Sequence, residues 1–359
     1  MTLYCGSLYT QWHLDVSDRQ APCCFYDVSR KKEFDLAQDR LDMQSGRWPK
    51  RCEYCRVNEA LGARSPRLDY TQRVRDAGWP DSDDSQLFSL SLFIGNKCNL
   101  HCITCDAKYS TGWIKIAEEF DVDQSPHVGI DTMRLDTLLP RLKSLNELSI
   151  MGGEPMYQDD LLKVISYLSQ HLDLSHCLLK VTTNGVTRPS AELLDAMSMF
   201  SGVDLTMSID GVGDSYEYIR HPAKWNDLLD NIRYYKDMPN LIKTMRMNAT
   251  ISTANLWEVD RIAEWGVKNF GINFEFNMAR KNQWEIHNLP AEIKFDWVKT
   301  FGDKPWNKPV HSRINQWGYD SVSWQSFRSF IRAWDQRWGL DFATTFPEYA
   351  SVIKKHDLW

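Results

Sequence analysis

The sequence predicts an α/β fold, in which helices surround a parallel sheet or a partial barrel. Six short segments with the length and apolar content of strands alternate with longer segments of helical periodicity. Several of these strands also alternate polar and apolar residues, and short loops that contain glycine follow them. Together these observations predict βα units whose chemistry lies in the loops at the carboxyl ends of the strands.

Each expected element follows from its local pattern. The strands are expected at 87–94, 147–152, 178–183, 203–210, 242–252 and 270–277. The helices are expected at 111–120, 159–172, 191–200, 225–238 and 255–266, because apolar residues recur there at helical spacing. Ser190 is expected to open the third of these helices, and Pro290 to occupy the first turn of a further helix within 288–301.

Polar residues share one face of several expected strands. The clearest sets are Thr244, Arg246, Asn248 and Thr250 on one strand, and Asn273, Glu275 and Asn277 on the next. If helices cover the apolar face, the polar face lines a wet interior that could hold a ligand. The alternative is an antiparallel sheet with one solvated side, which the intervening helices disfavour. Arg246 and Glu275 are therefore candidate substrate contacts, with a mutual buried ion pair as the competing interpretation.

The composition limits the class of protein. The chain has 359 residues, of which 43% are hydrophobic and 25% charged, which is typical of a globular protein. It carries 42 basic and 48 acidic residues, so its formal net charge of −6 argues against a chain-wide nucleic-acid surface. No stretch approaches the ~20 apolar residues of a membrane-spanning helix, and no signal peptide is visible. We expect a cytoplasmic protein without a membrane partner.

The cysteines are concentrated near the beginning of the chain. Eight of the nine lie within the first 105 residues, and disulfides are rare in the cytoplasm, so metal binding is the leading explanation. Cys98, Cys102 and Cys105 form C-x3-C-x2-C directly after the first expected strand. Three thiolates close in sequence suit an iron–sulfur cube with one iron left open.

A second, dispersed set of cysteines precedes that loop. It comprises Cys5, Cys23 or Cys24, Cys52 and Cys55, which could close a metal site completely. Zinc at this set is a minority alternative, because zinc ribbons usually separate their cysteine pairs by about 15–20 residues. Here 46 residues lie between Cys55 and Cys102. Cys177 stands alone and is expected to be a small buried hydrophobe.

The loops after the next three strands have compositions suited to ligand binding. They read GGEP (152–155), TNG (183–185) and SIDG (208–211). Gly152 and Gly153 lack a Cβ and let a ligand approach the backbone closely, while Pro155 fixes the turn. A GGEP sequence one βα unit after the three-cysteine loop is a specific combination.

On these motifs the chain resembles the radical S-adenosylmethionine (SAM) superfamily over about residues 87–280. The resemblance implies a partial (β/α)6 TIM-like barrel with a [4Fe–4S] cluster on Cys98, Cys102 and Cys105, whose open iron binds SAM. It further implies SAM contacts from the loop and strand-end residues Gly152, Gly153, Glu154, Thr183, Asn184, Ser208 and Arg220. The family often has an aromatic residue before the third cysteine, but here it is Thr104, so Ile251 or Phe274 could hold adenine instead.

The N-terminal cysteines resemble the ligands of a twitch or SPASM-type module. The resemblance implies that Cys5, Cys23, Cys52 and Cys55 are ligands of an auxiliary [4Fe–4S] cluster; adjacent Cys24 leaves the second ligand open, and spacing favours Cys23. The predicted organisation is an auxiliary-cluster module at 1–70, a linker at 71–86, the barrel at 87–280 and a helical, tryptophan-rich C-terminal region at 281–359. This resembles the group of twitch domain-containing radical SAM proteins.

The resemblance implies reductive cleavage of SAM to a 5′-deoxyadenosyl radical that abstracts a substrate hydrogen. An auxiliary cluster without an open iron would accept an electron, which favours a two-electron oxidation of a small molecule or a peptide. The proton acceptor could be Glu275, Asp210 or Asp106. A flavodoxin or ferredoxin is the expected electron donor. The alternatives are a redox-neutral epimerisation or rearrangement, a peptide modification, and a non-catalytic iron–sulfur or zinc module.

The tryptophans at the end of the chain have two interpretations. Trp306, Trp317, Trp324, Trp334, Trp338 and Trp359 all lie beyond residue 300. They could form an aromatic substrate cage. The favoured expectation is a helix that packs its aromatic face against the open side of the barrel.

Overall fold

The computed structural model of the protein describes residues 3–15, 20–27, 34–60, 62, 64–80, 83–120, 122, 132–302, 304–315 and 318–359. The chain divides into two units, and each consists of three separate segments of sequence. The first unit comprises Met1–Asn96, Pro126–Thr182 and Pro189–Asp204. The second comprises Lys97–Ser125, Thr183–Arg188 and Leu205–Trp359. The predicted boundaries at 70, 86 and 280 stay a prediction.

The sheet contains all six strands that the sequence predicts. They are β3 (Ser89–Phe93), β4 (Glu147–Met151), β5 (Leu178–Thr183), β6 (Gly202–Ser208), β7 (Ile242–Ile251) and β8 (Phe274–Met278). The strand order is β2-β1-β3-β4-β5-β6-β7-β8. The pairs β3–β4, β4–β5 and β7–β8 are parallel, as βα units require.

Two short N-terminal strands extend the sheet, and the sequence does not predict them. Strand β1 (Gln11–Leu14) pairs in parallel with β3, with Trp12 opposite Leu90. Strand β2 (Gln20–Ala21) pairs antiparallel with β1. At four and two residues these strands are too short to show a period, and β3, which pairs with β1, is far away in sequence.

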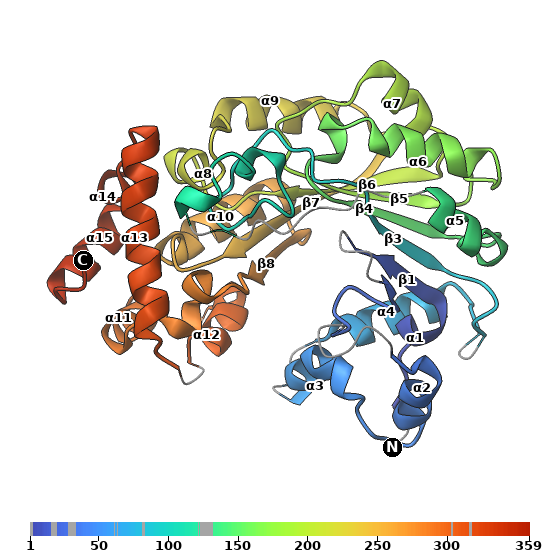
Figure 1. The fold of residues 1–359 in the computed structure, drawn as a ribbon, viewed down its shortest axis with the longest axis horizontal. Coiled ribbons are helices and arrows are strands. Elements are labelled where there is room, and N and C mark those ends of the chain that lie inside the picture. Colours follow the sequence, from blue (N-terminus) through green and yellow to red (C-terminus); the bar gives the residue numbers. More distant parts are fainter. Residues whose placement is uncertain are drawn as a thin grey trace. The chain divides into compact units, whose positions relative to one another are not determined.

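The helices of the first unit lie at its N-terminus and between its strands (Figure 1). They are α1 (Ser7–Thr10), α2 (Leu36–Gln44), α3 (Glu53–Ala60), α4 (Pro66–Asp76), α5 (Thr132–Leu138), α6 (Asp160–Ser169) and α7 (Ala191–Met197), with 3-10 turns at Lys50–Cys52, Leu139–Arg141 and Pro155–Tyr157. As predicted, Ser190 caps α7, because its side chain accepts from the N–H of Leu193.

Helix α4 occupies part of the expected linker. Residues 71–76 lie inside α4, whose first turn contains Pro66 and whose N-cap is Ser65. Thr71 binds the backbone N–H of Gly6 through its hydroxyl at 3.0 Å, and Tyr70 packs edge-on against Phe88. The Asp- and Ser-rich composition that suggested a linker therefore begins only after this helix.

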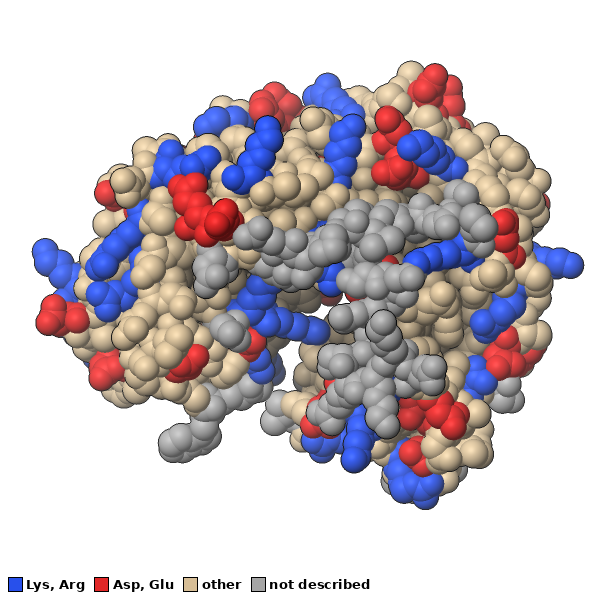
Figure 2. All heavy atoms as spheres, viewed as in Figure 1, with Lys and Arg blue, Asp and Glu red and all other residues tan. Residues whose placement is uncertain are grey.

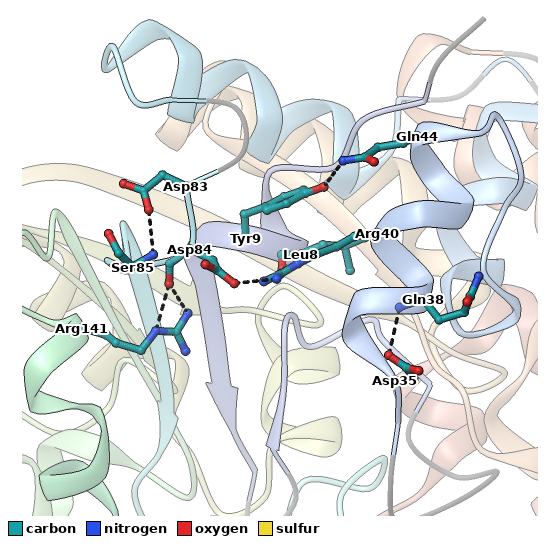
Figure 3. Close-up of polar contacts among 10 residues, drawn as sticks. All are labelled: Leu8, Tyr9, Asp35, Gln38, Arg40, Gln44, Asp83, Asp84, Ser85 and Arg141. Atoms are coloured by element: carbon teal, nitrogen blue, oxygen red, sulfur yellow. Dashed lines mark hydrogen bonds and ion pairs between the residues drawn. The ribbon is translucent and has the colours of Figure 1, made fainter.

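A polar network connects the N-terminal helices to the segment before β3 (Figure 3). The Arg40 guanidinium on α2 donates to the Leu8 carbonyl at 2.8 and 2.9 Å and forms an ion pair with Asp84 at 2.5 Å. Arg141 donates to the Asp84 carbonyl at 3.0 and 3.2 Å. These bonds join three separated stretches of the first unit at one place.

The second unit contains the helices that follow β6 and the entire C-terminal region (Figure 1). They are α8 (Asp214–Ile219), α9 (Trp225–Lys236), α10 (Val259–Phe270), α11 (Ala291–Phe301), α12 (Lys308–Ile314), α13 (Ser321–Trp338), α14 (Phe342–Thr345) and α15 (Pro347–Lys355). Its 3-10 turns lie at Thr111–Trp113, Glu118–Phe120, Leu256–Glu258, Asn282–Trp284, Ile286–Asn288 and Pro305–Asn307. Pro290 is the N-cap of α11 rather than a first-turn residue.

The expected helix at 111–120 is wrong. The segment forms two 3-10 turns, Thr111–Trp113 and Glu118–Phe120, instead of a continuous α-helix. The reason is local, because Ser110 caps the first turn and the Trp113 side chain is bonded back to the cysteine loop. A Cβ on Gly112 would lie only 2.8 Å from the Leu100 carbonyl, so the loop and this segment are in close contact.

Most tryptophans of the C-terminal region are packing residues. Trp334 is fully buried and stacks on Trp113 with ring centroids 5.6 Å apart, while Trp324 is 3% exposed. Trp338 is half-buried against His221. This supports the packing interpretation for α13. Trp359 is 40% exposed, and Trp317 lies outside the described residues.

Two surface properties bear on possible partners. In the part of the chain that the structure describes, no helix combines the length and the apolar character needed to cross a membrane. Figure 2 shows basic and acidic side chains interspersed over the face that it draws.

Candidate functional site

The three-cysteine loop begins the second unit and is anchored by its own backbone. The Cys98 N–H donates to the Thr111 hydroxyl at 3.1 Å, and the Cys105 N–H donates to the Cys102 carbonyl at 2.9 Å. Ser110 donates to the Leu100 carbonyl at 2.7 Å. These internal hydrogen bonds give the loop a defined conformation.

Trp113 supports this loop from the side of the C-terminal helices. Its indole N–H donates to the Cys102 carbonyl at 3.1 Å, and its ring is fully buried. The ring packs between Phe120, Phe330 and Trp334, the last two of which belong to α13. Helix α13 thus supports the cysteine loop through Trp113.

Arg220 brings a buried positive charge to one of the thiols. Its Nη1 lies 3.7 Å from Cys102 Sγ, and its Nη2 forms an ion pair with Asp210 at 2.7 Å. Asp210 is 1% exposed and also accepts from the Thr250 N–H at 2.7 Å. Burial lowers the pKa of Arg220 and the adjacent Asp210 carboxylate raises it, and the net result is a raised pKa.

Asn184 supplies a polar contact to a second thiol. Its side-chain amide lies 4.0 Å from Cys98 Sγ and donates to the Asn99 side-chain carbonyl at 2.8 Å. The side-chain carbonyl of Asn184 accepts from the Val186 N–H at 3.0 Å, which fixes the orientation of the side-chain amide. Thr183 is buried, and its hydroxyl accepts from the Gly185 N–H at 3.0 Å. The TNG turn and the cysteine loop therefore meet in the second unit.

The electrostatics of the thiols fit a metal-bound state. Burial raises the pKa of Cys102 to about 12, and the Arg220 charge opposes that rise. Burial also raises the pKa of Cys105, and repulsion from Cys102 and Cys98 adds to it. The three sulfurs are thus close enough to act on one another. Iron would stabilise the thiolates that burial disfavours, so these cysteines fit the three ligands of an iron–sulfur cube.

Convergence on a single metal ion is a different geometry. Within the described ranges, no group of three or more His, Cys, Asp or Glu side chains is arranged to hold one metal ion. The thiolates of a four-iron cube each bind a different iron and surround the cube.

The GGEP loop lies in the first unit and has the backbone that its glycines permit. Gly152 and Gly153 have φ values of +113° and +46°. A Cβ on Gly152 would lie 2.6 Å from the Gly95 carbonyl, so a side chain would clash there. Glu154 is fully buried, and its side chain caps the following turn by accepting from the Met156 N–H at 3.0 Å.

The N-terminal cysteines lie together in the first unit. Cys5 belongs to a small core with Leu8, Tyr9, Ala21, Tyr26 and Met43, and Cys23 and Cys52 pack against this core. Burial raises the pKa of Cys5 to about 11, and Cys55 adds to the rise. Burial also raises the pKa of Cys23 and Cys52, and repulsion from Cys5 raises the pKa of each further. Cys24, in contrast, is exposed.

Charged and polar groups surround Cys55, which is buried on α3. Burial raises the pKa of its thiol, and a backbone N–H of Arg67 opposes that rise. The Arg67 side chain forms a two-pronged contact with Glu59, at 2.9 Å from Nε and 2.6 Å from Nη2. Arg67 also lies over the Trp48 ring at 5.3 Å. The N-terminal cysteines other than Cys24 are thus buried or half-buried, and the Arg67 guanidinium lies near Cys55.

The structure separates the candidate substrate contacts from the buried groups. Arg246 on β7 and Glu275 on β8 are exposed, so the competing interpretation of a mutual buried ion pair is wrong. Asp106 is 2% exposed and pairs with Lys281, which follows β8. Ser208, the last residue of β6, is half-buried. The roles that the sequence suggests for these residues stay predictions.

Sequence reasoning missed several residues that shape the site. Asn99, Trp113 and Lys281 contact the cysteine loop or its neighbours, and Asn255 holds the Asp210 carbonyl at 2.7 Å. Asn99 lies inside the cysteine motif, so an asparagine between the first two cysteines was an available signal. The others come from distant segments, and no local pattern marks them.

The fold and the site define an α/β protein with a three-cysteine iron–sulfur loop after a strand of a largely parallel sheet. The sequence matches the family described as the radical SAM superfamily over residues 92–275. That match covers more than half of the chain, and the chain belongs to this superfamily, whose members are SAM-binding enzymes with a [4Fe–4S] cluster.

No curated protein matches the chain. Solved structures with a similar fold include native anSMEcpe with bound AdoMet, at 12% identity over 70% of this chain and 62% of that chain, with a TM-score of 0.43. Streptococcus suis SuiB bound to the precursor peptide SuiA is similar at 10% identity over 88% and 69%, with a TM-score of 0.38. TYW1 with a lysine-pyruvate adduct follows at 15% identity over 57% and 69%, with a TM-score of 0.31.

The similarity to the first of these proteins is partial. Four anSMEcpe structures are matched over 50, 60, 60 and 62% of their own length. The chain therefore spans less than two thirds of those proteins.

Proposed function

We propose that the chain is a radical SAM oxidoreductase that removes a hydrogen atom, a proton and an electron from a small molecule or a peptide. The observation that carries this proposal is the clustering of four N-terminal cysteines, Cys5, Cys23, Cys52 and Cys55, in addition to the three-cysteine loop. A site closed by four thiolates has no iron free for substrate, so an auxiliary [4Fe–4S] cluster there would serve electron transfer.

The three-cysteine loop would hold the SAM-binding cluster, with Cys98, Cys102 and Cys105 as ligands. When bound, that cluster and SAM would supply the radical chemistry that removes the substrate hydrogen. The chain itself holds the loop in place through Trp113 and Asn184, and its three cysteines are half-buried. A flavodoxin or ferredoxin would deliver the electron.

The choice of proton acceptor can be narrowed. Asp210 is buried against Arg220, and Asp106 is buried against Lys281, so each carboxylate is already neutralised by a cation. Glu275 is exposed on β8, one strand from the polar residues Asn248 and Thr250. We therefore favour the Glu275 carboxylate as the group that takes up the substrate proton.

Iron content and SAM cleavage test the proposal together. Anaerobic reconstitution should load about eight iron and eight sulfide per chain, as expected for two cubes. Replacing Cys98, Cys102 and Cys105 by alanine should leave about four iron and abolish reductive formation of 5′-deoxyadenosine. Replacing Cys5 and Cys55 should leave about four iron and retain that activity in the absence of substrate.

Cys24→Ala is the matched control, since Cys24 is exposed and should not affect the iron content. Four iron in the wild-type chain, or zinc bound by the N-terminal cysteines, would contradict the auxiliary cluster and leave a redox-neutral reaction as the better explanation.

A further inference from the structure

Two backbone hydrogen bonds place the cysteine loop beside the segment that follows α8. The His101 N–H donates to the His221 carbonyl at 2.7 Å, and the Ile103 N–H donates to the Ile219 carbonyl at 2.9 Å. Residues 101 and 103 flank Cys102, and residues 219 and 221 flank Arg220. This two-bond pairing sets Cys102 and Arg220 opposite each other by the register of the backbone.

The Arg220 side chain uses that placement to reach the sulfur. Its Nη1 lies 3.7 Å from Cys102 Sγ, which is within hydrogen-bonding range for a thiol or thiolate acceptor. The side chain is only 10% exposed, so its charge is weakly screened by water. A guanidinium in this position acts on any group that the sulfur binds.

Asp210 fixes the guanidinium from the other side. Its Oδ2 lies 2.7 Å from Arg220 Nη2, and its Oδ1 accepts from the Thr250 N–H at 2.7 Å. Asn255 donates to the Asp210 backbone carbonyl at 2.7 Å, and Asn255 is itself fully buried. The end of β7 therefore holds the Asp210 carboxylate, and the turn after β7 holds the Asp210 backbone. In the pair, the positive member is the one that contacts Cys102.

We propose that Arg220 is a positioning residue that raises the reduction potential of the cluster on Cys98, Cys102 and Cys105, and that Asp210 limits this effect. Reduction adds one negative charge to the cluster. A nearby positive charge stabilises the reduced form, and a hydrogen bond to a ligating sulfur acts in the same direction. A nearby carboxylate does the opposite. The pair therefore sets the driving force for the electron that enters the site.

This inference assigns the two residues roles different from those that the sequence suggests. The guanidinium acts on a cysteine ligand, and the Asp210 carboxylate orients that guanidinium instead of accepting a substrate proton. Neither role depends on an auxiliary cluster or on the substrate, so the inference stands or falls separately from the proposed oxidation.

The two charges predict opposite effects, which a merely structural role would not produce. The measurement is an anaerobic redox titration of the reconstituted full-length protein, followed by electron paramagnetic resonance without SAM. The spectrum of the triple variant at Cys98, Cys102 and Cys105 is subtracted, so that iron bound elsewhere does not contribute. The variants are Arg220→Gln, Arg220→Lys and Asp210→Asn.

Arg220→Gln should lower the ratio of reduced to oxidised cluster at a fixed potential by about tenfold, which equals about 59 mV for one electron. Asp210→Asn keeps an acceptor for the Thr250 N–H and should raise the same ratio. Arg220→Lys should give an intermediate decrease, because it keeps the charge and loses the two-pronged geometry. Arg233→Gln is the matched control, since Arg233 is an exposed arginine paired with Asp230, and its ratio should stay within twofold of wild type.

Shifts of the same sign for Arg220→Gln and Asp210→Asn, or shifts below twofold for both, would overturn the inference. If the Arg220→Gln variant takes up no iron, the Asp210→Asn and Arg220→Lys variants test the inference instead. In that case a lower or unchanged ratio for Asp210→Asn refutes the proposed role.

Discussion

Trp113 offers a direct test of how the buried aromatic cluster supports the cysteine loop. Trp113→Phe removes the indole N–H that donates to the Cys102 carbonyl and leaves that acceptor without its donor. A buried polar group that loses its partner costs about 1–3 kcal/mol. The smaller ring also gives up roughly two CH groups of fully buried contact, worth about 1.5 kcal/mol. We therefore expect a loss of about 2.5–4.5 kcal/mol.

The loss should fall on the loop more than on the rest of the chain. If all of it favours opening of the loop, the opened population rises at least about 50-fold, since 1.4 kcal/mol is tenfold. The assay is the rate at which reconstituted protein loses iron to a chelator under anaerobic conditions, measured beside urea unfolding of the iron-free protein. The rate of iron loss and the urea unfolding midpoint of each variant are compared with those of the wild-type protein.

Trp324→Phe is the matched control for this substitution. Like Trp113, Trp324 is buried, and its indole N–H donates to a backbone carbonyl, that of Leu358, at 3.2 Å; it lies on α13. It should reduce the free energy of unfolding by a similar amount and leave the rate of iron loss close to wild type. Equal rates of iron loss for the two variants would refute the idea that Trp113 supports the cluster loop specifically.

Three further perturbations have expected outcomes. Gly152→Ala should lower the free energy of unfolding, measured by urea titration, by several kcal/mol, because φ is +113° and a Cβ would meet a carbonyl at 2.6 Å. Gly271→Ala is the control: its φ is +59° but the space around it is open, so its free energy of unfolding should fall less. Burial lowers the pKa of His221 from 6.5 to about 4, so its neutral form is favoured by folding and wild-type stability should fall as pH drops between these values. His221→Asn should flatten that part of a melting-temperature profile, and an unchanged slope would contradict it. Glu59→Gln removes the anionic partner of Arg67 and should cost about 1.5–3 kcal/mol, measured as faster cysteine labelling of the iron-free protein.

The strands and the cysteine loop could be predicted because their signals are local. Six runs of strand length and a C-x3-C-x2-C motif are visible without knowing what contacts what. The N-terminal strands β1 and β2 could not be predicted, because four and two residues carry no period and β1 pairs with the distant strand β3. The segment 111–120 has apolar residues at helical spacing, but the bond from Trp113 to Cys102 and the close approach of Gly112 prevent a helix.

The candidate site shows the same limit. Arg220 and Asp210 were both identified, but as a SAM contact and a proton acceptor. Their pairing depends on α8, which returns the chain to the strand end, and sequence spacing does not show that return. Spacing favours Cys23 over adjacent Cys24; Cys24 is exposed and Cys23 half-buried in the structure, and the choice between them stays a prediction.

The pairing of β1 with β3 has a consequence for dissecting the protein. Residues 11–14 come from the cysteine-rich N-terminal segment, yet they cover one edge of the sheet. Deleting that segment would leave the N–H and C=O groups along this edge of β3 open to solvent, and an uncovered strand edge promotes intermolecular pairing and aggregation. A barrel expressed alone from residue 87 would therefore be prone to precipitate. The N-terminal segment is an integral part of the sheet, so a shortened protein should retain it.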